Sequence, residues 1–177
     1  MANCKLNADL LRSTSCGYFL PEIVDIYLAN YDDLSGTPAV SADSANCSTI
    51  TAITLDTSKT FYHVEPQKNS ASFEDTLVVE DNGTKYRHAS ISFTVAGVYD
   101  ACKVAALDAL SLGRYFVVVK TADGAYIGLG RISPLEASVA TLSGGGDTNG
   151  MQITLEGNVA ESPLPLSEGA IATVTGS

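Results

Sequence analysis

Apolar and polar residues alternate along much of the chain, and this alternation predicts β-strands. Residues 89–95 place Ala, Ile, Phe and Val at every second position, with Ser or Thr between them. Residues 151–156 repeat the pattern, with Met, Ile and Leu against Gln, Thr and Glu. Because consecutive side chains of a strand point to opposite faces, each run predicts a strand with one apolar and one polar face.

Residues 73–95 predict a long β-hairpin. The run at 73–80 leads into Asp81, Asn82 and Gly83, and the alternating strand follows. Asn-Gly is a strong hairpin signal because both positions accept a positive φ. Shorter β-rich runs predict further strands at residues 22–30, 49–55, 60–65, 115–119, 126–132 and 135–142.

Two of these runs carry extra information about packing. Residues 115–119, Tyr-Phe-Val-Val-Val, are apolar throughout and predict a central strand that is buried on both faces. In the next run, Gly128 and Gly130 leave one face nearly bare, which predicts a close approach by a neighbouring element.

Residues 100–112 predict a helix. Asp100 can cap its first turn, Ala and Leu fill it, and Gly113 ends it. The expected apolar stripe consists of Tyr99, Cys102, Ala106, Ala109 and Leu110.

The remaining segments predict loops and two terminal arms. Turn-forming residues dominate 31–48 and the glycine-rich stretch 143–150. We expect an N-terminal arm at 1–21, one domain at 22–157 and an extended C-terminal arm at 158–177. The predicted fold is mainly β: an antiparallel β-sandwich or half-barrel with one flanking α-helix.

Charge narrows the range of functions. The 177 residues include 20 acidic and 10 basic side chains, for a net charge of −10, which disfavours a free-standing nucleic-acid binder. No Lys or Arg follows Arg131, so the last 46 residues carry only negative charges. This acidic segment either keeps the protein soluble, or forms a surface that repels a polyanion, or is an arm that docks on another molecule. No apolar run approaches the roughly 20 residues that cross a bilayer, so we expect no membrane insertion. The N-terminus lacks the apolar core of a secretory signal, so we expect synthesis in the cytoplasm.

Candidate chemistry is sparse, and we expect no enzyme, no cofactor and no metal. His63 and His88 lie in separate predicted strands without a nucleophile–base pattern. The four cysteines have no metal-ligand spacing, and we expect reduced thiols, with Cys102 packed in a core. The loop 144–150 lacks the lysine of a phosphate-binding loop and the first carboxylate of a calcium loop.

One polar strand face is made of small uncharged groups. Ser90, Ser92 and Thr94 form one row, and Gln152 and Thr154 begin another. Such a face either meets solvent, or contacts another subunit, or lines a channel where long charged side chains would obstruct passage.

Several short motifs resemble one family. They are FYHVEPQKN at 61–69, the Asp-Asn-Gly hairpin, RYFVVVK at 114–120, DGAYIGLG at 123–130 and SGGGDTNGMQITLEG at 143–157. Together, over roughly residues 22–165, the chain resembles the tail-tube-like and neck-ring structural proteins of tailed bacteriophages, especially crAss-like phages. Cys4 and Cys16 in a short N-terminal arm are also similar to that group.

The resemblance implies a virion structural protein, made in the bacterial host cytoplasm, that forms a ring around a DNA channel. It implies six- or twelve-fold rings that stack on other tail, neck or portal proteins and that let the genome pass during ejection. Within such a ring, we expect the assembly contacts to be Asp81, Asn82, Gly83, Ser90, Ser92, Thr94, Gly144, Gly145, Gly146, Asp147, Asn149 and Gly150.

Two other readings of the sequence stay open. A capsid decoration or accessory protein would have the same β-rich composition. A monomeric β-sandwich binding module, for example for carbohydrate, usually displays exposed aromatic residues, and this chain has no Trp.

Overall fold

A computed structural model describes residues 22–42, 48–97, 100–145 and 149–176. The predicted arm at 1–21, the candidate contacts Gly146 and Asp147, and three of the four cysteines lie outside the described residues.

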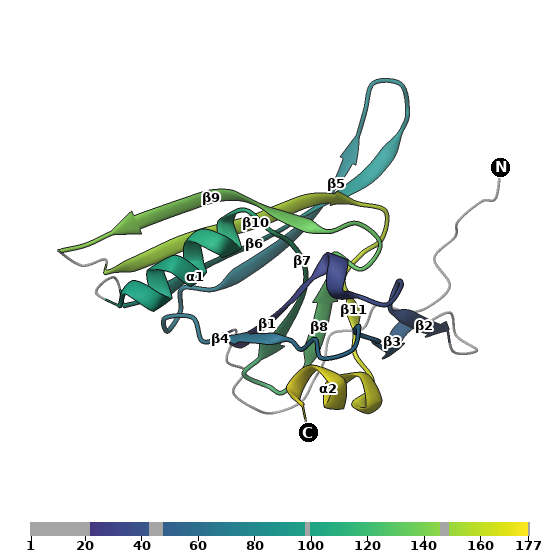
Figure 1. The fold of residues 1–177 in the computed structure, drawn as a ribbon. Helices are drawn as coiled ribbons and strands as arrows, with labels where there is room; N and C mark the ends of the chain where they lie inside the picture. The colour runs from purple at the N-terminus through teal and green to yellow at the C-terminus, as the bar shows by residue number, and fades with distance from the viewer. Residues whose placement is uncertain (1–21, 43–47, 98–99, 146–148, 177) are drawn as a thin grey trace, which may run out of the picture.

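The described chain is mainly β, with antiparallel pairing between its strands and two α-helices (Figure 1). The strands are β1 Ile23–Asn30, β2 Ala39–Ala42, β3 Ser48–Ala52, β4 Tyr62–Val64, β5 Ser72–Val79, β6 Lys85–Ala96, β7 Arg114–Thr121, β8 Tyr126–Leu129, β9 Leu135–Ser143, β10 Gly150–Val159 and β11 Leu164–Pro165. The helices are α1 Ala101–Ser111 and α2 Glu168–Thr175, with a 3-10 turn at Tyr31–Asp33. The predicted fold class and the predicted hairpin of residues 73–95 are confirmed.

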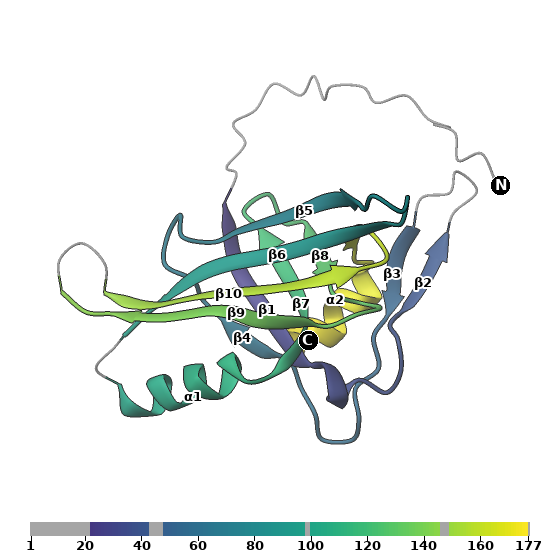
Figure 2. The same ribbon diagram turned by 90° about the horizontal axis from the view of Figure 1, so that it is seen from above.

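Strand β7 connects two layers of one folded sheet (Figures 1 and 2). Its residues Val117–Lys120 lie between β1 and β8, and β4 and β11 extend that layer at its two sides. Only Arg114 and Tyr115 of β7 pair with β9, the first strand of a second layer ordered β9-β10-β6-β5. The sheet therefore bends at this short contact, and its two halves form the sandwich.

The main core lies between these two layers. It takes the apolar faces of β1, β6, β7 and β10, and Leu107 and Leu110 of α1 close one end of it. Phe93, Ile153 and Leu155 are fully buried there, as the alternation of the two runs predicts. All five residues of 115–119 are buried, which confirms a central strand that is covered on both faces.

A second core covers the outer face of β7. Phe116 and Val118 pack there against Ile50 of β3 and against Leu166, Ala170 and Val174. Because Leu166, Ala170 and Val174 recur every four residues, they form one stripe along α2 and the turn before it.

Residues 158–176 do not form the predicted extended arm. Ser167 caps α2 by accepting a hydrogen bond from the Ala170 amide (3.4 Å), and Gly176 ends the helix in the left-handed conformation (φ +71°). The alternating strand β10 also continues to Val159. Between β10 and α2, Pro165 belongs to β11 and pairs with Ile127 of β8.

Three smaller predictions are also wrong. Cys102 is exposed and does not pack in a core. The buried stripe of α1 consists of Leu107 and Leu110, since Ala106 and Ala109 are exposed. The expected loop at 31–48 contains β2, which pairs with β3. The Asp100 cap is confirmed, because its carboxylate accepts hydrogen bonds from the amides of residues 102 and 103.

Replacing Gly128 by alanine should destabilise the second core. A Cβ there would lie 2.7 Å from Ile50 Cδ1 and 3.1 Å from Phe116 Cζ. Because a packed core relaxes poorly around an added methyl group, we expect the free energy of unfolding to fall by about 1–3 kcal/mol in urea titrations. The control is Gly169→Ala in α2, where the nearest atom would be 3.7 Å away. Equal stability of the two variants would contradict this packing.

Candidate assembly interface

The β5–β6 hairpin projects from the body of the molecule and carries the first predicted contact region (Figure 1). Its tip, Asp81–Gly83, is exposed. The turn is a loop of residues 80–84 closed by a hydrogen bond from the Glu80 amide to the Thr84 carbonyl (2.9 Å), not a two-residue turn. Only Gly83 has a positive φ (+82°), and Asn82 instead accepts a hydrogen bond from the Thr84 amide through its side chain (2.9 Å).

The β9–β10 loop carries the second predicted contact region. Gly144, Gly145 and Asn149 are exposed, and Gly145 has a φ of +90°. Gly150 is buried as the first residue of β10, and a Cβ there would lie 2.5 Å from the Val95 carbonyl oxygen. Gly150 is therefore needed for close packing within the chain, so its prediction as an assembly contact is wrong.

The two loops do not meet. Gly150 pairs with Ala96 at one end of β6, whereas the tip of the β5–β6 hairpin lies just before Lys85, at the other end. They therefore mark opposite ends of the β9-β10-β6-β5 layer (Figure 2).

The predicted polar rows lie side by side on the outer face of this layer. Ser92 is paired with Thr154 and Thr94 with Gln152, and the hydroxyls of Ser92 and Thr154 are 2.8 Å apart. Ser90, Ser92 and Thr94 are half-buried, whereas their neighbours on the other face are buried in the main core. The structure thus brings the two rows together into one hydroxyl- and amide-lined surface.

The charge of this outer face is negative. By strand alternation its charged positions are Glu74, Glu136 and Glu156, while Lys85 and Arg87 point to the opposite face. Arg87 Nε binds Asp75 Oδ2 there at 2.5 Å. Among the described residues of these four strands, the outer face therefore has no Lys or Arg.

The same layer has an edge without a full strand partner on each side, and α1 lies alongside the β9 edge (Figures 1 and 2). In the described part of the chain, β5 pairs only with β6, so its other edge has no strand partner. On the side away from β10, β9 pairs only through Leu135 and Glu136, which contact β7. Both edges expose apolar side chains. They are Leu77 (54% exposed), Val79 (56%), Val139 (43%) and Leu142 (52%).

These four residues are half of the eight large apolar side chains that the described residues leave exposed. An unpaired, apolar strand edge is a template for pairing with another chain. The sequence pattern placed all four residues in strands but could not show that β5 and β9 lie at edges, because edge position depends on the topology.

The two histidines lie in different layers of the sheet and have different partners. His63 Nε2 lies 2.9 Å from Asp25 Oδ1 in one layer, and His88 Nδ1 lies 3.0 Å from Asn158 Oδ1 in the other. Burial by itself raises the pKa of the Asp25 carboxyl, but hydrogen bonds from His63 and Lys120 outweigh it and hold that pKa below its usual range. This cluster ties β1, β4 and β7 together as an ion-pair network.

Other chemistry receives no support from the geometry of the described residues. They contain no group of three or more His, Cys, Asp or Glu side chains that could hold a metal ion. None of their helices is both long and apolar enough for a membrane span.

No family model, curated protein or solved structure matches this chain.

Proposed function

We propose that the protein is a structural virion protein whose copies form a ring around the DNA channel of a phage tail or neck. One observation carries the proposal: the β9-β10-β6-β5 layer has two apolar edges without a full strand partner, and the described residues of its outer face include no Lys or Arg. The family resemblance of the motifs supports the phage setting, and the six- or twelve-fold symmetry belongs to the same proposal.

Two different edges on one layer favour a ring over a two-fold dimer. When edge β5 of one copy pairs with edge β9 of the next, each copy offers both halves of the same interface. Such head-to-tail contacts produce a closed ring if the rotation between copies closes. The layers would join into a continuous barrel without free edges, held by backbone hydrogen bonds and by burial of the four exposed apolar side chains.

The outer face of the layer has the chemistry that a DNA channel needs. Small hydroxyl and amide groups leave space, and the carboxylates repel phosphate groups. Because this repulsion is screened beyond about 10 Å at 0.1 M salt, it acts on DNA that passes close to the wall. The ring would then guide a genome without binding it, and would work with other tail, neck or portal proteins without any catalytic step.

Shortening the β5–β6 hairpin should weaken assembly. In the variant, Asn-Gly replaces Val79–Lys85 and directly joins the paired residues Val78 and Tyr86. We expect at least about a tenfold higher dissociation constant, because an exposed apolar contact and the exposed tip are lost. Light scattering and electron microscopy would measure the effect, with wild-type protein giving rings that have a central opening.

The hairpin variant also needs a control for folding. The circular dichroism spectrum and the thermal unfolding of the shortened variant, measured on dilute monomeric protein, should match those of wild-type protein, because the remaining residues of both strands keep their pairing. Normal rings from the shortened variant would contradict a role of the hairpin in assembly.

A further inference from the structure

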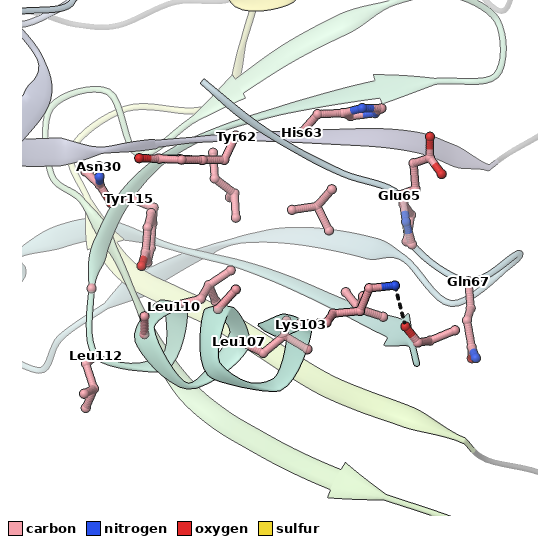
Figure 3. Close-up of a pocket in the computed structure, with 18 residues that line it drawn as sticks. Asn30, Tyr62, His63, Glu65, Gln67, Lys103, Leu107, Leu110, Leu112 and Tyr115 are labelled. Atoms are coloured by element: carbon pink, nitrogen blue, oxygen red, sulfur yellow. Dashed lines mark hydrogen bonds between the residues drawn. The ribbon is translucent and has the colours of Figure 1, made fainter. Parts of the chain in front are cut away.

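A groove of about 1040 Å³ separates α1 from β4 (Figure 3). Leu107 and Leu110 of α1 form one wall, and Tyr62 and Val64 of β4 form the other. Tyr115 lies at one end of the groove, and Gln67 and Lys103 lie at the opposite end (Figure 3).

The groove has an apolar floor and a polar rim. Leu28, Leu107 and Tyr115 are buried at its base, while Tyr62 (56%) and Leu112 (88%) leave large apolar surfaces exposed at its mouth. An apolar surface of this kind on one molecule marks a binding groove. The Lys103 ammonium is already bonded to the Ala96 carbonyl (3.2 Å). Glu65 on the rim has no ionic partner among the described residues.

The described chain begins beside one end of this groove. Glu22 accepts a hydrogen bond from the Asn69 amide (3.2 Å), and Gln67, two residues earlier, lines the groove. Twenty-one residues precede Glu22, and an extended chain of that length spans up to about 70 Å. The groove runs along α1, whose 11 residues measure about 16 Å, so five or six extended residues cover it.

The preceding segment has a composition that suits the groove. Its larger apolar residues gather in two groups, Leu6, Leu10 and Leu11, then Tyr18, Phe19 and Leu20. Between these groups Arg12 carries a positive charge, and Lys5 carries another just before the first group. Either cation can pair with Glu65 on the rim while the leucines enter the groove.

We propose that residues 1–20 of the chain bind in the groove between α1 and β4 of the same molecule. The apolar residues of this segment cover Leu107, Leu110 and Tyr62, and a basic side chain of the segment pairs with Glu65. Attachment at Glu22 keeps the segment at a high effective concentration beside the groove. This proposal does not depend on ring formation.

A peptide of residues 1–20 tests the proposal on two forms of the protein. We expect the labelled peptide to bind a form that begins at Pro21, in a fluorescence polarisation titration. The full chain should bind it about 100-fold more weakly, because its own segment competes at a roughly millimolar effective concentration. Equal binding to both forms would overturn occupation by the same molecule, and no binding to either form would overturn the groove assignment.

Two substitutions on α1 provide a matched control. Ala106 lines the groove and Ala105 does not, although both are exposed. In the form that begins at Pro21, Ala106→Glu should abolish peptide binding and Ala105→Glu should leave it unchanged. In the full chain, Ala106→Glu should also speed tryptic cleavage after Arg12 at least tenfold. Equal cleavage rates in the Ala105→Glu and Ala106→Glu variants would overturn the proposal.

Discussion

Lysine at Leu77 and Val79 should leave the protein monomeric. Both side chains are more than half exposed on edge strand β5, so the substitutions remove apolar contact without disturbing a core. Burying two ammonium groups beside another strand costs several kcal/mol, so we expect association to weaken at least about 100-fold. Sedimentation velocity measures this change, with Ile132→Lys as the control because Ile132 is 44% exposed away from both edges.

The opposite edge permits a sharper form of the same experiment. Val139→Lys with Leu142→Lys blocks β9 and should also give a monomer. A mixture of the two double variants should form a dimer that grows no further, because the free β9 of one pairs with the free β5 of the other. A β5–β5 contact would instead let the β9 variant dimerise alone, and that result would contradict head-to-tail pairing.

Lysine at Ser92 and Thr94 should turn the proposed channel into a DNA-binding surface. The two positions are neighbours on the outer face of β6, and that face has no Lys or Arg among the described residues. Each copy would add two positive charges to the channel, so the total added charge is twice the number of copies in the ring. We expect the variant to bind double-stranded DNA with an affinity that falls steeply as salt rises, and wild-type protein to show no binding in the same filter assay.

A charge-matched variant shows whether DNA binding depends on where the two lysines lie or only on the net charge of the protein. Val24→Lys with Ile132→Lys adds the same two charges at exposed positions away from this face. It should bind DNA no better than wild-type protein does. Equal binding by both double variants would show that the outer face of the layer has no special relation to DNA.

Alternation along the strands predicted much of the fold. The runs around Phe93 and Ile153 showed which faces enter the core, because a strand repeats every two residues. Asp100 and Gly113 correctly bracketed α1, since capping is a local property of the chain. Helix α2 was missed because Ala170 and Gly169 give only a weak apolar signal before the chain is folded.

The candidate site was predictable only in part. The polar rows of β6 and β10 were visible in the sequence, and the structure places them side by side. Gly150 was misassigned because its role, close approach to the Val95 carbonyl, depends on strand pairing. The positions of the edge strands and of the groove beside α1 also depend on the strand order in the sheet. Sequence periodicity does not encode that information.

The mass of the purified protein across a wide concentration range tests the central claim most directly. Pairing of the β5 and β9 edges predicts one large species at high concentration, with a mass that is a fixed multiple of the 18.4 kDa chain. A species of 18.4 kDa at every concentration, with both edges intact, would contradict assembly through these edges.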